Sequence, residues 1–155
     1  MKGLWYYEYP IGKIAIAEEN EAISHVFFES NKKNAGSDQR ETPLIKETAN
    51  QLNEYFQGKR NTFDVPLSPQ GTLFQQSVWR ALQMIKFGET CSYKDVAIYI
   101  GNDRGARAVG MANNRNPISI IIPCHRVIGK NGNLVGYGGG LRTKKYLLDL
   151  EKKYA

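Results

Sequence analysis

Hydrophobic and polar residues alternate along the start of the chain in a pattern typical of antiparallel strands. Short turns separate three such segments, at residues 4–8, 13–17 and 22–28. The alternation returns at residues 63–67 and predicts one more short strand there. The pattern therefore predicts a small antiparallel sheet in the N-terminal part of the chain.

Further along, apolar residues recur three and four positions apart, as they do in amphipathic helices. Thr42 before Pro43 is typical of a helix start, and Gly58 is typical of the end of the same helix. Thr72 and Ser92 open two capping boxes, which predict two more starts. Together these signals predict helices at residues 43–57, 73–87, 93–100, 105–114 and 141–153.

The net charge of +6 is unevenly distributed. Residues 1–68 carry 8 Lys and Arg against 10 Asp and Glu, whereas residues 69–155 carry 13 against 5. A segment rich in Pro and Gly at residues 66–71 coincides with this change, so we predict two domains, 1–68 and 69–155. A basic half suits a polyanion such as nucleic acid, but solvated basic faces are common, and both interpretations stay open.

Composition narrows the class of protein. The 155 residues are 41% hydrophobic and 23% charged, as in an ordinary globular protein, and we expect no membrane span and no signal peptide. Two cysteines, Cys91 and Cys124, make no disulfide framework, which favours a reducing cytoplasm. Together with His25 and His125 they show no metal-ligand spacing, so we expect no metal site.

One stretch joins a buried segment to reactive groups. Residues 117–122 are apolar and bounded by prolines, which predicts a short buried strand that ends just before Cys124, His125 and Arg126. An imidazole beside a thiol lowers the thiol pKa or takes its proton, so Cys124 is a candidate nucleophile. A free cysteine is also commonly a small buried hydrophobic residue, and that alternative stays open.

The helices predicted at residues 93–100 and 105–114 are joined by a tight, glycine-containing turn. Such a pair is typical of a DNA-docking helix-turn-helix or of a plain helical hairpin. Residues 91–145 carry nine Lys and Arg against two Asp and Glu, which favours DNA. The second helix is rich in Gly and Ala, which predicts contacts to phosphates more than to bases. Asn131-Gly132 predicts a hairpin, as in the wing of a winged helix.

These motifs together resemble the O6-alkylguanine-DNA alkyltransferases, also called methylated-DNA–protein-cysteine methyltransferases. The matching segments, in family order, are Ser92-Tyr93-Lys94-Asp95-Val96-Ala97, Ala106-Arg107-Ala108-Val109-Gly110, Asn116-Pro117, Ile122-Pro123-Cys124-His125-Arg126-Val127, and Gly136-Tyr137 with Gly139-Gly140-Leu141. The resemblance implies an α+β fold. Its N-terminal domain would be ribonuclease-H-like, an antiparallel sheet with a helix. Its C-terminal domain would be a mostly helical winged helix-turn-helix.

The resemblance also implies roles for individual residues. Cys124 would accept the alkyl group, and His125 would deprotonate the Cys124 thiol through an ordered water. Glu151 would orient the imidazole. Asn116 would brace the turn that holds Cys124 and His125. Tyr93 would press on the phosphate of the target nucleotide and donate a proton to its base.

The family implies that the second helix of the helix-turn-helix enters the minor groove. Arg107 would then occupy the space of a flipped-out base. The residues implied in DNA contact are Ser92, Tyr93, Lys94, Ala106, Arg107 and Arg115, and those implied in the base pocket are Met111, Val127, Tyr137 and Gly138. Gly138 stands where many relatives have a hydroxyl residue, so one contact to O6 would be lost or replaced by a backbone N–H.

The implied function is direct DNA repair. The alkyl group of O6-alkylguanine in double-stranded DNA would move to Cys124 once per molecule, in a monomer without a cofactor, and O4-alkylthymine stays open as a second substrate. A non-catalytic alkyltransferase-like protein is the main alternative, but that class lacks the cysteine. A Cys-His hydrolase would need a direct contact that consecutive residues at a strand end do not make. A transcription regulator would leave the Cys-His-Arg run unexplained.

Overall fold

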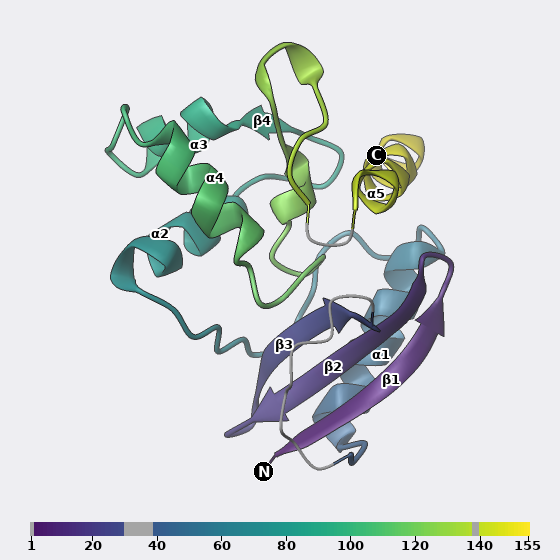
Figure 1. Cartoon of the computed structure of the whole chain (residues 1–155). Coiled ribbons are helices and arrows are strands. Elements are labelled where there is room, and N and C mark those ends of the chain that lie inside the picture. The colour runs from purple at the N-terminus through teal and green to yellow at the C-terminus, as the bar shows by residue number, and fades with distance from the viewer. Residues whose placement is uncertain (1, 30–38, 138–139) are drawn as a thin grey trace.

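The chain folds into two parts, shown in Figure 1. The structure is a computed structural model and describes residues 2–29, 39–137 and 140–155. A sheet with one helix forms the N-terminal part, and the remaining helices with short strands and loops form the C-terminal part. The predicted α+β class is therefore confirmed.

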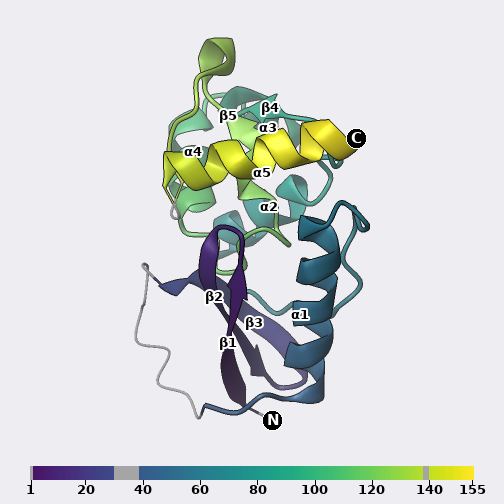
Figure 2. The same cartoon turned by 90° about the vertical axis from the view of Figure 1, so that its right-hand side faces the viewer.

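The N-terminal part is an antiparallel sheet covered by a helix. The strands, in their order across the sheet, are β1 (Gly3–Tyr9), β2 (Gly12–Glu19) and β3 (Ala22–Phe28). Helix α1 (Pro43–Phe56) packs on this sheet, as Figures 1 and 2 show. The Thr42 hydroxyl caps α1 by accepting from Ile45 N, and Ile16 of β2 and Leu52 of α1 are fully buried. These strands and this helix confirm the sequence prediction.

The C-terminal part is mostly helical. It contains α2 (Leu73–Leu82), β4 (Cys91–Ser92), α3 (Tyr93–Tyr99), α4 (Ala106–Asn114), the 3-10 turn η2 (Cys124–Arg126), β5 (Val127–Ile128), the 3-10 turn η3 (Lys130–Gly132) and α5 (Leu141–Tyr154). Both capping boxes form, and α3 and α4 pack as the predicted pair. Trp79 Nε1 donates to Ala112 O at 2.9 Å and so ties α4 to α2. None of the described helices is long and apolar enough to cross a bilayer.

Two predicted strands are wrong. Leu67 makes a single bridge to Ile23, and Pro66 cannot extend that bridge into a ladder because it has no N–H. The apolar segment 117–122 likewise makes one bridge, from Ile118 to Val26, and otherwise turns.

The predicted wing is also only partly right. Asn131 and Gly132 form the turn, with φ of 64° and 79°, but residues 133–137 form no strand. Strand β5 pairs instead with β4, in parallel, which places Val127 opposite Cys91. In α5, Tyr146 is 39% exposed, and Lys144 is fully buried.

Candidate active site

Cys124 begins the turn η2, directly after the loop that was expected to be a strand. The Asn116 side chain shapes that loop, because its Oδ1 accepts from Ile118 N at 3.0 Å and its Nδ2 donates to Ile122 O at 2.7 Å. Ile120 in the same loop has a φ of 73°, a rare value for a β-branched residue. The thiol is therefore presented by a braced turn, and Cys124 is only 4% exposed.

A buried carboxylate, that of Glu151 on α5, holds the two residues that follow Cys124. Its Oε2 accepts from His125 Nε2 at 2.6 Å. Arg126 donates to both oxygens, from Nε to Oε1 at 2.8 Å and from Nη2 to Oε2 at 3.0 Å. His125, Arg126 and Glu151 are all buried, so the structure brings together the imidazole and the carboxylate that the resemblance implied.

Burial and charge set the protonation of this cluster. Burial raises the pKa of the Cys124 thiol to about 11, although a hydrogen bond from Asn116 and the charge of Lys144 act in the opposite direction. Burial lowers the pKa of His125 and outweighs the attraction of Glu151. At neutral pH the cluster therefore holds a protonated thiol beside a neutral imidazole.

Glu151 is the charged member of the cluster. Burial alone would raise its pKa, but hydrogen bonds and positive charge from His125 and Arg126 prevail and lower the pKa to about 2. An ionised carboxylate keeps a proton on Nε2 of His125. The lone pair of Nδ1 is then free to accept a proton.

Three more side chains lie close enough to Cys124 to interact with its charge: Tyr93, Tyr137 and Lys144. Lys144 Nζ donates to Val127 O at 2.6 Å and to Val135 O at 2.8 Å, and the Tyr93 hydroxyl donates to the same Val135 carbonyl at 3.1 Å. The Tyr137 ring packs edge-on against Phe28, and burial raises the pKa of its hydroxyl. Val127 is fully buried, and Gly138 lies outside the described residues.

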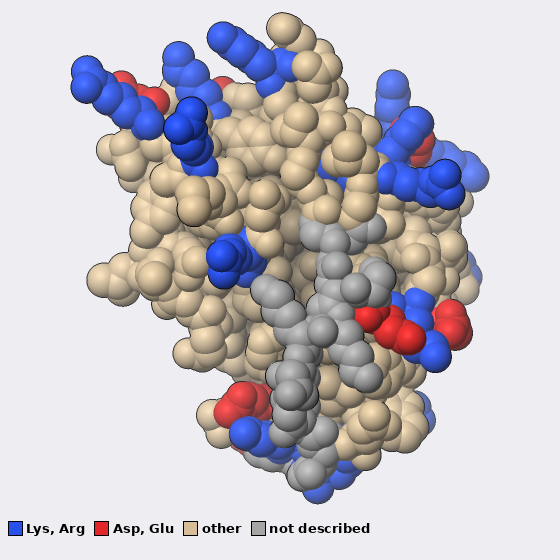
Figure 3. Space-filling view, viewed as in Figure 1, with Lys and Arg blue, Asp and Glu red and all other residues tan. Residues whose placement is uncertain are grey.

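The residues implied in DNA contact lie at one end of the C-terminal part. Arg107 and Met111 are four positions apart on the exposed side of α4, and Met111 is 66% exposed, so it lies beside Arg107 rather than on the buried side with Asn113. Lys94 and Arg115 are exposed, whereas Ser92 and Ala106 are half-buried. In Figure 3, Lys and Arg side chains gather along the upper edge, over α3, α4 and the loop after β5.

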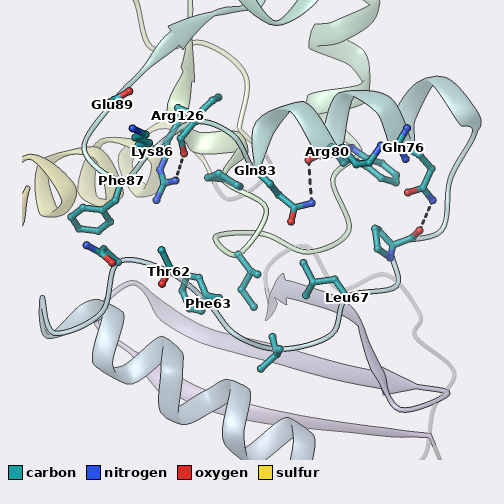
Figure 4. A pocket seen from close by; sticks show the side chains of 17 residues that line it. Thr62, Phe63, Leu67, Gln76, Arg80, Gln83, Lys86, Phe87, Glu89 and Arg126 are labelled. Atoms are coloured by element: carbon teal, nitrogen blue, oxygen red, sulfur yellow. Dashed lines mark hydrogen bonds between the residues drawn. The ribbon is translucent and has the colours of Figure 1, made fainter. Parts of the chain in front are cut away.

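A cleft of about 930 Å³ lies between residues 61–69 and α2, and Arg126 lines part of it. Figure 4 shows Phe63 and Leu67 on one wall and Arg80, Gln83 and Arg126 on the other. Arg126 Nη1 donates to Ile85 O there at 2.6 Å. The lining includes Pro123 and Arg126 but neither Cys124 nor His125, so the cleft does not open on the thiol.

Some residues of the site escaped sequence reasoning. Lys144 lies three and seven positions before Leu147 and Glu151, so a lysine on the buried stripe of α5 was a usable signal. Tyr55 lies on the buried side of α1, and no local pattern predicts its contact with Glu151, 96 residues away. Among the described residues, no group of three His, Cys, Asp or Glu side chains is arranged to hold a metal.

Two protein-family models match the chain. Residues 5–69 match "6-O-methylguanine DNA methyltransferase, ribonuclease-like domain". Residues 73–153 match "6-O-methylguanine DNA methyltransferase, DNA binding domain". Together the two matches cover most of the sequence.

Individual proteins agree with the family models. A methylated-DNA–protein-cysteine methyltransferase of Methanosarcina acetivorans is 49% identical over 148 residues, which are 94% of this chain and 95% of the relative. The constitutive enzyme of the same name from Bacillus subtilis is 45% identical over 94% of this chain and 92% of the relative. A crystal structure of Mycobacterium tuberculosis OGT in complex with DNA matches with a TM-score of 0.92 and 43% identity, over 99% of this chain and 94% of that one.

Proposed function

Because the chain belongs to the 6-O-methylguanine DNA methyltransferase family, we propose that it repairs DNA by moving the alkyl group of O6-alkylguanine to its own Cys124. The contact of His125 with Glu151 beside a buried thiol, next to a basic helix pair, carries this proposal. The similar proteins named methylated-DNA–protein-cysteine methyltransferases, and the M. tuberculosis structure with DNA, support it.

In the proposed reaction the Cys124 proton passes through an ordered water to Nδ1 of His125. The sulfur attacks the alkyl carbon, so the S–C bond forms while the O6–C bond breaks. The guanine leaves as an anion and takes up a proton, and Tyr93 is the proposed donor to the base. Glu151 stabilises the imidazolium that forms on His125. The product thioether has no carbonyl for water to attack, so the protein acts once, and no step requires a cofactor.

Access to O6 requires the base to leave the duplex, at roughly a few kcal/mol. We infer that Arg107 fills the vacated position, and that Tyr137 and Val127 line the pocket for the base. Since Met111 is exposed beside Arg107, its proposed contact is with the nucleotides next to the pocket. The residues proposed to hold the DNA backbone are Ser92, Tyr93, Lys94, Ala106 and Arg115.

The alternative of a non-catalytic alkyltransferase-like protein is not favoured, because Cys124 is present. We further infer a monomer with a domain boundary at residues 68–69. Two free cysteines, Cys91 and Cys124, suit a reducing compartment, and we infer the cytoplasm.

The test is intact-mass spectrometry after incubation with duplex DNA that contains O6-methylguanine. We expect one added methyl group, located on Cys124 by peptide mapping and absent from Cys124→Ala. The matched control Cys91→Ala should gain the methyl group as the wild type does. An unchanged wild-type mass together with tight binding to the damaged DNA would support the non-catalytic alternative.

A further inference from the structure

The N-terminal part contributes one polar side chain to the proposed active site. Tyr55 of α1 donates its hydroxyl to Glu151 Oε2 at 2.6 Å, across 96 residues of sequence. Tyr55 is 0% exposed and Glu151 is 1% exposed, so no solvent competes for this hydrogen bond. Figure 2 shows how the contact becomes possible, because α5 lies across the end of α1.

The acceptor of Tyr55 is the oxygen that also accepts from the imidazole. Oε2 of Glu151 accepts from Tyr55, from His125 Nε2 at 2.6 Å and from Arg126 Nη2 at 3.0 Å. Oε1 accepts from Arg126 Nε at 2.8 Å and from Gly88 N at 3.2 Å. Tyr55 is thus a neutral donor, like the resting imidazole of His125, and its removal leaves the contacts of the carboxylate with His125 and Arg126 in place.

Neighbouring aromatic rings fix the direction of the Tyr55 hydroxyl. Ring centroids of Phe56, Phe63 and Phe87 lie 5.4, 5.6 and 6.0 Å from that of Tyr55. Phe87 comes from the C-terminal part and also packs against the Arg126 guanidinium, 5.8 Å from the ring centroid. A ring held on several sides cannot rotate away, so its hydroxyl is a preorganised donor.

We propose that Tyr55 is a positioning residue, which holds Glu151 Oε2 in the place where it orients the imidazole of His125, with Nδ1 left to accept the proton of Cys124. This inference rests on the proposed function, since it concerns the same imidazole. It gives the N-terminal part a chemical role: the docking of α1 on α5 is needed to orient the base.

The test compares Tyr55→Phe with the wild type in single-turnover transfer from O6-methylguanine in duplex DNA. The ring and its packing remain, so we expect unchanged affinity for DNA and a transfer rate constant lower by about tenfold at saturating DNA. With one donor fewer, Oε2 attracts the imidazole proton more strongly. The acid limb of the plot of transfer rate against pH should therefore move to higher pH. Arg126 and Lys144, the cations near His125, are present in both proteins and do not account for this shift.

The matched control is Tyr9→Phe, which removes a tyrosine hydroxyl of the same half that donates to Ala49 O at 3.0 Å. It should leave the rate and the pH profile unchanged. A double-mutant cycle with Glu151→Gln separates position from general stability, because Tyr55→Phe should add no further loss once the carboxylate is gone. A wild-type rate for Tyr55→Phe, an equal loss in Tyr9→Phe, or additive losses in the cycle would overturn the inference.

Nitrogen-15 NMR of His125 in the unreacted protein gives a readout that needs no transfer. We expect the Nε2–H tautomer in the wild type and a higher imidazole pKa in Tyr55→Phe. If the imidazole pKa rises in Tyr55→Phe but the wild type transfers no methyl group, the proposed function fails and the positioning contact stands. If the imidazole titrates identically in both proteins, Tyr55 does not act on His125.

Discussion

Cys91 and Cys124 belong to neighbouring stretches of the C-terminal part, since Cys91 of β4 pairs with Val127, three residues after Cys124. Burial raises the pKa of both thiols to about 11. Cys91 is half-buried, and the charge of Asp95 contributes to its raised pKa. Both thiols are thus weaker acids than an ordinary cysteine, so acidity does not single out the proposed nucleophile.

The neighbours of the two thiols differ more than their acidity. Asn116 and Lys144 favour the thiolate of Cys124, and a neutral imidazole with a free lone pair follows it in the chain. Cys91 has an acidic neighbour instead. A protonated thiol resists stray electrophiles, so we interpret Cys124 as a sulfur that is activated only when a bound base brings the reacting carbon to it.

The largest expected effect comes from the carboxylate behind Cys124. Glu151→Gln leaves Arg126 buried without its counter-charge, so we expect the free energy of unfolding in urea at pH 7 to fall by about 3–5 kcal/mol. The matched control is Glu54→Gln, which breaks the part-exposed pair with Arg60 and should cost less than about 1 kcal/mol. Equal losses in the two variants would contradict a structural role for the buried pair.

The same variant has a defined pH signature. The folded pKa of Glu151, about 2, lies below its ordinary value of 4.5, so its stabilisation is present above pH 4.5 and is lost as the pH falls toward 2. The acid loss of stability should therefore be shallower in Glu151→Gln.

A smaller effect is expected from the cation beside Cys124. Lys144→Met removes the charge that lowers the thiol pKa, so alkylation of Cys124 by iodoacetamide at pH 8 should slow on the order of fivefold. Lys145→Met is the matched control, because Lys145 is exposed and pairs with Asp149 at 2.6 Å. Similar rates in the two variants would show that Lys144 only braces the Val127 and Val135 carbonyls.

The smallest effect concerns Cys91. Asp95→Asn removes the negative charge that raises the Cys91 pKa, so iodoacetamide should alkylate Cys91 about twofold faster in a Cys124→Ala background. An unchanged rate would mean that burial alone sets the acidity of Cys91.

Sequence reasoning succeeded where the determinants are local. The strands at the N-terminus, the caps at Thr42, Thr72 and Ser92, and the α3–α4 pair depend on neighbouring residues and formed as predicted. It failed at residues 117–122, where apolar composition suggested a strand but the Asn116 side chain takes the backbone partners within a loop. The division at residues 68–69 stays a prediction.

The sequence predicts the reactive residues of the site but not all of the side chains that hold them in place. Cys124 and His125 were found from their succession after an apolar run, and the partnership of His125 with Glu151 came from a family resemblance. Tyr55 reaches the site from α1, so its contact with Glu151 depends on how the two parts dock, whereas Lys144 contacts Val127 and Val135 within the C-terminal part. A contact across 96 residues, like that of Tyr55 with Glu151, leaves no mark within a local window of sequence.

The tight burial of Cys124 has a consequence for the spent molecule. At 4% exposure, the sulfur has little room for an extra carbon, and overfilling a packed interior typically destabilises a fold by about 1–3 kcal/mol. Calorimetry of the reacted and unreacted chains should therefore show a lower melting temperature after reaction. The alkylated protein would then unfold more readily than the unreacted protein, and cellular proteases degrade the less stable form faster.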